Sequence, residues 1–458
     1  MKVNACPQCL EKQREIDRLR EENTRLKQQL RYRQRQAEQG AFGSSTPSSQ
    51  LPAKANTPQD GRAKRGGAPA GHVGHGRRAL DPEGADRVET VSVDSRCPQC
   101  GGILEPKGFR ERTVFDSQPV DTERILYRLE RKYCPHCRKA VEARPPGVLP
   151  KALIGNQRVS QIVFWHYQHG IPLGRLSEQT RLGLGTLIET LHRLAALFGP
   201  VMPVLVTQYR QAEVRHADET SWRTDGHSGY AWLFASSTVS LFLFRSTRSA
   251  SVAREVLGQA PLKGYLVADR YNGYNRVPCA LQYCYAHLLR EVEDLAQEFA
   301  DHAEVRAFTA CLIPLLAQAM HLHSQPLSQA QYSRQARQLQ QQILEVVAQP
   351  AQHLGVRRIQ DRFSANARRL YHWVENRQVP ADNNRAEREL RPTVIARKVS
   401  FGSQSDAGAK TREVLMSLVH TLKKRYPDPQ GHFKRVLDQL ALDPAQDPVS
   451  WLFPIDSS

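Results

Sequence analysis

The stretch VRHADETSW, residues 214–222, decides the fold of this chain of 458 residues. The pattern of side chains changes there to a period of two, which indicates a β-strand. Asp218 lies near the middle of the predicted strand. A single aspartate in such a place is ordinarily a turn or capping residue, so its meaning depends on the segments that follow.

The segments downstream of this strand predict three more strands and one helix. Three strands, a helix and a fourth strand are the order expected of an RNase H-like sheet, in which the first and fourth strands are neighbours. The fourth strand ends at Asp269, so Asp218 and Asp269 are expected to meet at one edge of the sheet. The predicted elements are strands at 230–236, 240–245 and 264–268 and a helix at 249–258.

A third acidic motif, ADNNRAERELRP, occupies residues 381–392. Asp382 is predicted to cap a short helix, and Pro392 is predicted to end it. Glu387 lies on that helix four residues before Arg391, within reach of an ion pair. Alone, a helix rich in Asp and Arg is more often a solvated face. The arginines of the motif are Arg385, Arg388 and Arg391.

Four motifs together, HADETSW, VADRYNGY, YCYAHLLRE and DNNRAERELRP, resemble the DDE transposases of the insertion-sequence 66 (IS 66) family. The resemblance covers most of the chain and implies a multidomain α+β protein with an RNase H-like (retroviral-integrase-type) core. It implies that Asp218, Asp269 and Glu387 are catalytic and bind two Mg²⁺ (or Mn²⁺) ions per active site. In phosphodiester transfer one ion activates the attacking oxygen and the other stabilises the leaving oxygen. Three carboxylates are the hard ligands that Mg²⁺ prefers.

The same resemblance gives supporting roles to His287 and Arg391. His287 matches a Trp-Ala-His type element of the family, although Tyr285 stands where Trp is expected. It either acts near the scissile phosphate or is a packed helix histidine. Arg270 stands where the family more often has Gly, and it either helps to hold a phosphate or points to solvent.

Six of the nine cysteines form three Cys-x-x-Cys pairs, which in an unsecreted chain indicates metal ligation rather than disulfides. The pairs CPQC and CPHC predict a zinc ribbon, because two knuckles supply four thiolates to one tetrahedral ion. No coordination position is left open, so this zinc is expected to be structural. Strands are expected between the pairs, at 112–115 and 124–133. The predicted zinc ligands are Cys97, Cys100, Cys134 and Cys137.

The N-terminal segment has the pattern of a short coiled coil, with apolar residues at alternating spacings of three and four. Asn23 falls at a core position, where a buried Asn favours a parallel dimer. A charged helix with chance leucines is the alternative. Cys6 and Cys9 of two paired chains would supply four thiolates to a second zinc ion, unless they stay unligated. The seam consists of Ile16, Leu19, Asn23, Leu26 and Leu30.

The chain carries 64 Lys+Arg against 46 Asp+Glu, a formal charge of +18 that points to a polyanionic partner. Residues 1–80 hold 16 basic and 7 acidic side chains, so +9, half of the total, lies there. The Gly-, Ser- and Pro-rich linker should not fold alone. Its basic segment, 61–78, either lies along a phosphate backbone or is a solubilising linker. The DNA-binding candidates of the linker are Arg62, Lys64, Arg65, Arg77 and Arg78.

Helical patterns dominate the rest of the chain. Three short helices before residue 200, with Gly183 and Gly185 in the last connection, predict a helix-turn-helix or a plain helical connector. A helical insertion with an apolar stripe, Tyr332 to Val346, precedes a helix at 365–376. A basic helix after the third-acid motif is expected to follow DNA or to be solvated. Further DNA-binding candidates are Arg385, Arg388, Arg397 and Lys398.

We therefore interpret the chain as a transposase that acts, at least as a dimer, on the terminal inverted repeats of its own element and on target DNA. Small accessory proteins of the same element are further expected partners. There are two alternatives: a non-catalytic zinc-dependent DNA-binding regulator and an RNase H-like structure-selective nuclease. The acid triad argues against the regulator, because a protein that only binds DNA has no reason to carry it.

The expected location is cytoplasmic and nucleoid-associated, because no apolar run approaches the ~20 residues of a membrane span and the charged start excludes a signal peptide. The expected division of the chain is a coiled coil at 1–38, a basic linker at 39–90, a zinc ribbon at 91–150, a helix-turn-helix at 151–205, a catalytic core at 206–400 with an insertion at about 288–376, and a basic helical tail at 401–458.

Overall fold

The computed structural model describes residues 144–453 without a break, most of 125–142, Ile103, and parts of 12–27. The described residues within 12–27 are helical, and their apolar seam is exposed. A helix is thus present where the coiled coil is predicted, and its pairing with a second chain stays a prediction. Outside the described residues lie Cys6, Cys9, Leu30 and the whole linker at 39–90.

A two-stranded hairpin carries one of the predicted zinc ligands. Strands β1 (Arg131–Cys134) and β2 (Lys139–Glu142) pair antiparallel, with Cys134 opposite Lys139. The strand expected at 124–133 begins only at Arg131, because residues 125–130 have no regular structure. The other three ligands and the strand expected at 112–115 lie outside the described residues.

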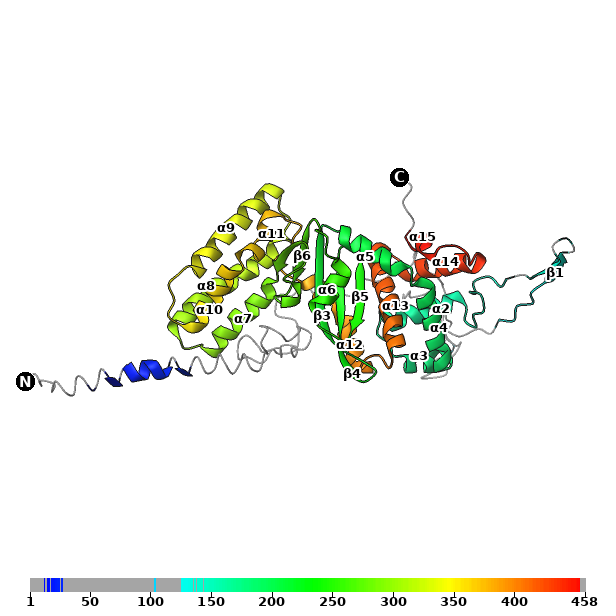
Figure 1. Cartoon of the computed structure of the whole chain (residues 1–458), viewed down its shortest axis with the longest axis horizontal. Helices are drawn as coiled ribbons and strands as arrows, with labels where there is room; N and C mark the ends of the chain where they lie inside the picture. The colour runs from blue at the N-terminus through cyan, green and yellow to red at the C-terminus, as the bar shows by residue number, and fades with distance from the viewer. Residues whose placement is uncertain are drawn as a thin grey trace, which may run out of the picture. The chain divides into compact units, whose positions relative to one another are not determined.

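A mixed sheet of five strands forms the centre of the described chain, in the order β5-β4-β3-β6-β7 (Figure 1). Strands β3, β4 and β5 are antiparallel, whereas β6 and β7 continue the sheet parallel to β3. Asp225 and Gly226, at φ 50° and 74°, form the tight turn between β3 and β4, where Asp-Gly is favoured. The mixed α+β prediction is confirmed. The strands are β3 (Val214–Thr224), β4 (His227–Ala235), β5 (Ser240–Arg245), β6 (Tyr265–Ala268) and β7 (Ala280–Tyr283).

Helix α6 (Ala250–Leu257) connects β5 to β6 and begins at Ser249, whose hydroxyl accepts from the Ser251 amide. The crossover makes β6 parallel to β3, with His216 opposite Val267. The first and fourth predicted strands are therefore neighbours. Continuing this register by two residues places Asp218 opposite Asp269.

In sequence, helices come both before and after the strands of the sheet. Those before it match the three helices expected from the sequence, and Gly183 is the N-cap of the third. One further helix leads into β3. They are α2 (Asn156–Tyr167), α3 (Leu173–Thr180), α4 (Leu184–Phe198) and α5 (Val201–Gln211).

The expected helical insertion follows β7. Its predicted apolar stripe packs inside, since Tyr332, Ala336 and Ile343 are buried. The single helix expected at 365–376 is wrong: α10 ends at Ala365, and a 3-10 turn at Ala367–Arg369 separates it from α11. The helices are α7 (Tyr285–Glu298), α8 (Ala303–Leu322), α9 (Gln329–Val347), α10 (Leu354–Ala365) and α11 (His372–Glu375).

Helix α8 is long and apolar enough to span a membrane, with a mean hydropathy of 1.4, and α4 with α5 meet the same criterion only as a pair bent by 56°. The sequence predicts no membrane span, and it places α4 in the helix-turn-helix and α8 in the helical insertion. In the structure α8 packs between α7 and α9, and its apolar residues Val305, Leu312 and Leu316 are buried there. Of its apolar window, 39% is buried.

The third-acid helix is longer than predicted. Helix α12 (Asn384–Ser400) continues past Pro392, so the prediction that Pro392 ends it is wrong. Proline removes one backbone hydrogen bond, that to Arg388, while buried Leu390 and Val394 hold the helix against β3 and β4. The N-cap is Asn383 rather than Asp382, although the Asp382 carboxylate does accept the amide of Asn384 at 2.9 Å.

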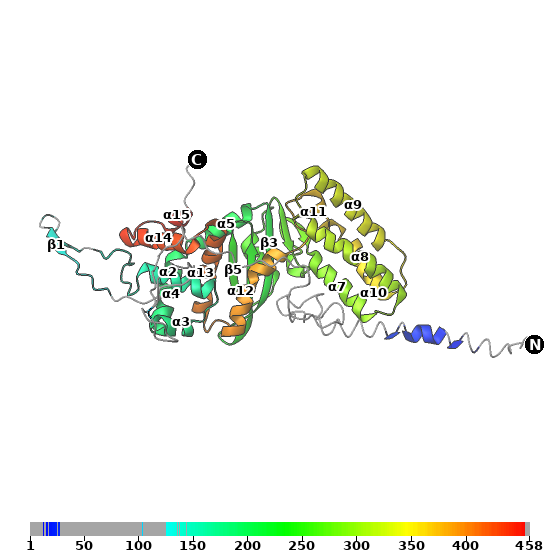
Figure 2. The same ribbon diagram turned by 180° about the vertical axis from the view of Figure 1, so that it is seen from behind.

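The alternative that the basic helix near the C-terminus is solvated is wrong, and its contact with DNA stays a prediction. Helix α13 (Asp406–Arg425) is buried along most of its length, and Figure 2 shows α12 across the sheet and α13 beside β5. Two more helices follow, α14 (Pro429–Leu442), which packs on α2, and α15 (Pro448–Leu452).

Helix α13 covers the free edge of β5. The hydroxyl of Ser417 accepts from the Phe242 amide at 2.8 Å, and that of Thr421 accepts from the Ser240 amide at 3.1 Å. The Glu413 carboxylate accepts from Phe244 at 3.3 Å. Four residues of helix advance ~6 Å and two residues of strand ~6.6 Å, so side chains four apart match alternate strand amides. An exposed edge would invite pairing with another chain, and α13 prevents this.

We expect Thr421→Val to lower the free energy of unfolding by ~1–3 kcal/mol, because a buried strand amide loses its acceptor without a change in side-chain volume. Urea unfolding followed by circular dichroism measures it. Ser450→Ala, at an exposed position of α15, is the control and should change nothing. Equal stability of Thr421→Val and the wild type would contradict the role given to this edge contact.

Candidate active site

Two buried aspartates lie side by side in the sheet. Asp218 on β3 is 6% exposed, and Asp269, directly after β6, is 5% exposed. The amide of Glu219 donates to Asp218 at 2.9 Å, and the amide of Tyr271 donates to Asp269 at 2.9 Å. The register of β3 and β6 thus brings together two residues that are far apart in sequence.

Burial and like charges hold both carboxyls near neutrality. Burial first, and then the charges of Glu219, Asp269 and Glu387, raise the pKa of Asp218 well above its usual value. Burial and Glu219 raise the pKa of Asp269 to about 7. A site in which acids oppose each other's ionisation becomes fully ionised only with a cation present.

A fourth acid, Glu219, was not predicted to belong to the site. It is almost completely buried, and its carboxylate accepts hydrogen bonds from Arg248 Nε at 2.8 Å and from the hydroxyl of Tyr274. The same guanidinium lies 4.0 Å from Asp269. Arg248 therefore bridges Glu219 and Asp269. The neighbouring acids Asp218 and Glu219 were a visible signal in the sequence, whereas nothing marked Arg248 or Tyr274.

Asn383 attaches the third-acid helix to the sheet. Its Nδ2 donates to the Ala217 carbonyl at 2.8 Å, and its Oδ1 lies 2.9 Å from His216 Nδ1. Its own amide donates to the Cys284 sulfur at 3.1 Å. Since Ala217 precedes Asp218, these contacts hold the start of α12 beside the two aspartates.

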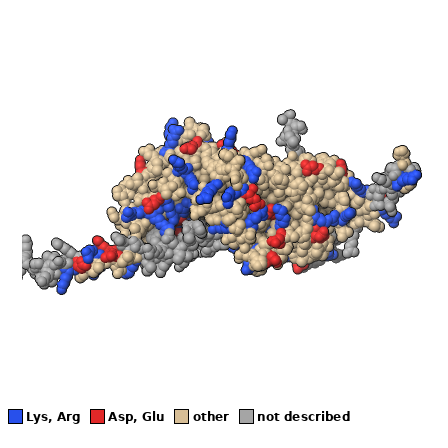
Figure 3. Space-filling model, viewed as in Figure 1, with Lys and Arg blue, Asp and Glu red and all other residues tan. Residues whose placement is uncertain are grey.

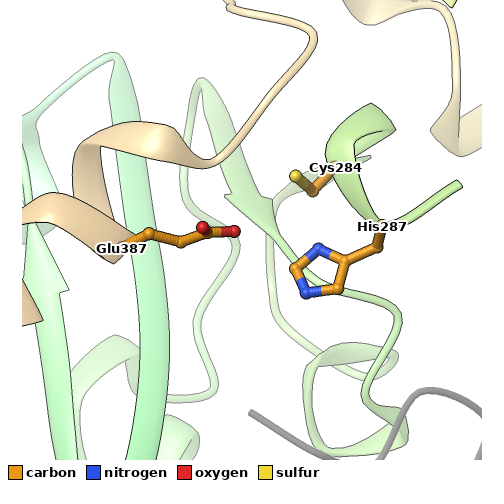
Figure 4. Close-up of side chains that lie close together, drawn as sticks. All are labelled: Cys284, His287 and Glu387. Atoms are coloured by element: carbon orange, nitrogen blue, oxygen red, sulfur yellow. The ribbon is translucent and has the colours of Figure 1, made fainter. Parts of the chain in front are cut away.

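Glu387, in the first turn of α12, has its side chain 14% exposed. Its ion pair is with Arg290, at 3.5 Å, and not with Arg391 as predicted from the helix spacing, because Arg391 lies on the exposed side of α12. Its charge raises the pKa of Asp218, so the predicted triad is one electrostatic group. The Glu387 carboxylate also lies within 4.8 Å of ligand atoms of Cys284 and His287 (Figure 4).

His287 is buried, and the Arg270 side chain is 13% exposed. Burial, and then Arg290 and Arg270, lower the pKa of His287 to about 3, which keeps its ring neutral. Arg270 forms an ion pair with Glu291, as does Arg362 from α10. Of the two readings of Arg270, the one that points it to solvent is therefore wrong.

The DNA-binding candidates of α12 differ in their surroundings. Arg397 donates to the Ser221 carbonyl at 3.2 Å, and Lys398 is exposed. Arg385 and Arg388 line a groove of about 1010 Å³ at the start of α12. The groove also contains His321, His323 and Arg425. The five linker candidates lie outside the described residues.

Residues 151–411 match the family model described as "Transposase IS66 family". The chain belongs to the IS66 transposase family. A second model, the "zinc-finger binding domain of transposase IS66", matches residues 94–138, which contain all four predicted ribbon cysteines. That match supports a structural zinc site, and it agrees with the family resemblance of the motifs.

Relatives of this family member occur in Sinorhizobium fredii. The protein y4qI is 22% identical over 78% of this chain and 73% of its own length. The protein y4jD is 23% identical over 76% of each chain. Both are named as uncharacterized proteins, so they show how much of the chain is similar but indicate no activity.

We expect Asp269→Asn to stabilise the metal-free protein relative to the wild type at neutral pH and above. The folded chain raises the pKa of Asp269 from 3.8 to about 7, so the stability provided by the neutral acid is lost as pH rises through that interval. Asparagine stays neutral, and its advantage should therefore vanish towards acid. The measurement is the difference in free energy of unfolding across pH, with a chelator present.

The control for this series is Asp301→Asn, an exposed position in the turn before α8, which should show no growing difference. A constant difference between Asp269→Asn and the wild type at all pH values would contradict the electrostatic account of the site.

Proposed function

We propose that this family member cleaves DNA at the terminal inverted repeats of its own element and joins the freed ends to target DNA. Asp218, Asp269 and Glu387 would hold two Mg²⁺ (or Mn²⁺) ions. The observation that carries the proposal is the register of β3 and β6, which places Asp218 opposite Asp269 while Asn383 holds the start of α12 against β3.

The sheet order supports an RNase H-like core. Counted along the chain from β3, the strands are arranged third, second, first, fourth, fifth, with the first three antiparallel. The two aspartates lie on the central pair, and the third acid comes from a helix packed on the sheet. This arrangement agrees with the core proposed for residues 206–400.

The residues present suit divalent cations of the hard type. The three carboxylates supply oxygen ligands, and the raised pKa values of Asp218 and Asp269 indicate negative charge without enough compensation. Bound metal ions would activate the attacking oxygen and stabilise the leaving oxygen. Arg248 would keep Asp269 in place from the Glu219 side, and neutral His287 would not repel the ions.

Arginines at the start of α12 would contact the DNA backbone. Arg385 and Arg388 line the groove there, and the first amides of α12 carry a partial positive charge that favours phosphate. Lys and Arg side chains also gather over the helical insertion and the sheet on the face seen in Figure 3. Their number favours sequence-independent contact with DNA.

Sequence-specific contact with the repeat ends is assigned to the N-terminal part. Helix α4 packs against α13, but Leu184 and Ile188 near its start are exposed, which leaves that end of the predicted helix-turn-helix accessible. The zinc ribbon, the basic linker and Arg397 and Lys398 would extend the interface. Pairing of two chains through the N-terminal helix would bring the two ends of the element together. The expected location of the active protein is the cytoplasm, on the nucleoid.

Wild type should cut DNA that carries the flanking inverted repeats in Mg²⁺ or Mn²⁺, whereas Asp218→Ala and Glu387→Gln should reduce cutting to background, because each removes an anionic metal ligand. Glu345→Gln, at an exposed position of α9, is the matched control and should cut normally. Binding to the repeats should be retained in all variants.

The outcomes of this assay separate the readings. Unaltered cutting by Glu387→Gln would remove Glu387 from the triad. Specific binding by the wild type without cutting, also when accessory proteins of the element are added, would favour the non-catalytic regulator. Cutting without preference for the repeats would favour the structure-selective nuclease.

Replacing both Cys97 and Cys100 by Ser should remove the ribbon zinc and most specific binding to the repeat ends, because two thiolates cannot hold a closed tetrahedral site. Zinc stoichiometry by atomic absorption is the measurement. Cys311→Ser, an exposed free cysteine on α8, is the control. Unchanged zinc content in the double variant would contradict the ribbon.

A further inference from the structure

Cys284, His287 and Glu387 bring one sulfur, one nitrogen and one oxygen together. Cys284 is the N-cap of α7, and His287 lies three residues later in its first turn, so both side chains share one face of the helix. Glu387 reaches them from the first turn of α12. One ligand atom from each lies within 4.8 Å of the other two, and the three side chains point into one space (Figure 4).

Polar atoms in this space lack partners. Nδ1 of His287 and Oε1 of Glu387 are both buried, and neither has a hydrogen-bond partner. His287 as a residue is only 5% exposed, and Cys284 is fully buried. A buried polar atom without a partner is unfavourable, so two of them around one small space indicate a ligand that satisfies both.

The surrounding groups suit a bound cation with two anionic ligands. The Asn383 amide donates to the Cys284 sulfur at 3.1 Å, an outer contact that orients the sulfur and stabilises a thiolate. Arg290 binds the other oxygen of Glu387 at 3.5 Å and leaves Oε1 free. The three ligands, one thiolate, one carboxylate and a neutral imidazole, carry two negative charges for a divalent ion, and the Arg290 charge is additional.

We propose that Cys284, His287 and Glu387 form a binding site for a divalent transition-metal ion, with Zn²⁺ as the best-fitting ion. Thiolate and imidazole ligands select Zn²⁺ or Co²⁺ over Mg²⁺. Zn–S and Zn–N bonds of about 2.3 and 2.0–2.1 Å would draw the ligand atoms slightly closer than they lie now. With three protein ligands, a tetrahedral ion keeps one position for water.

This site shares Glu387 with the proposed catalytic triad, and its consequence for activity rests on that proposed function. An ion bound to Cys284 and His287 holds Glu387 on the α7 side, away from Asp218 and Asp269. The catalytic set is then incomplete. Zn²⁺ at this site therefore keeps the transposase inactive, and its release frees Glu387.

The first experiment measures binding without any cleavage. The full-length protein, with Cys6 and Cys9 replaced by Ser throughout, is freed of zinc with a chelator, titrated with Co²⁺ and followed by absorption. We expect a thiolate-to-cobalt charge-transfer band that is missing in Cys284→Ser and present in Cys311→Ser. The ribbon contributes equally to all samples, so the difference spectrum isolates Cys284. Equal titrations of Cys284→Ser and Cys311→Ser would overturn the site.

Two further variants guard against misfolding of Cys284→Ser. His287→Gln and Glu387→Gln keep the thiolate, so each should retain the band and weaken Co²⁺ binding at least ~10-fold. Unchanged affinity in both would overturn the proposed ligand set. Circular dichroism of each variant shows whether the fold is kept.

The second experiment adds Zn²⁺ to the cleavage assay at constant Mg²⁺. Wild type should be inhibited, and Cys284→Ser should need at least ~10-fold more Zn²⁺ for the same inhibition. If Zn²⁺ inhibits the wild type and Cys284→Ser equally although Co²⁺ binding is confirmed, the metal site stands, but the proposal that it regulates Glu387 is overturned. If no protein cleaves DNA, the proposed function fails, while the Co²⁺ titration still decides the metal site.

Discussion

The buried side chain of Asn383 is the contact on which the site depends. It donates to Ala217 and faces His216 on β3, and its backbone amide donates to Cys284. One residue thus joins the central strand, the third-acid helix and the helix that carries His287. Because these polar groups are buried, losing any partner would leave the others unsatisfied, and the geometry is correspondingly well determined.

Around that contact the chain gathers acids whose charges oppose one another. Asp218 and Asp269 are held near neutrality by burial and by Glu219, which Arg248 compensates only in part. Such a site is poorly satisfied without a cation, and the metal ions that we propose for the triad would compensate its charge. Glu387 stands between two environments, the carboxylates of the sheet and the sulfur and nitrogen donors of α7.

The C-terminal helices complete the fold that supports this site. Side chains four residues apart on α13 satisfy the edge of β5, so the sheet ends there without an exposed strand. On the opposite side of β3, two short parallel strands lead to Asp269 and to Cys284. The sheet is therefore covered at one edge, and the two aspartates of the proposed triad lie at its interior strands β3 and β6.

The sequence by itself determined strands β3 to β6, the helical character of the insertion and the motifs that carry the acids, because periodicity and capping are local, but it did not predict β7. The motifs HADETSW and DNNRAERELRP also indicated the family. Only the tertiary structure decided that α12 passes Pro392, that α13 is buried, that Glu387 pairs with Arg290, and that Glu219 and Arg248 adjoin Asp269. These features depend on packing between segments that are distant in sequence. The burial gained there outweighs the hydrogen bond that α12 loses at Pro392 and the basic composition of α13. Such packing cannot be predicted from the spacing of residues along one helix.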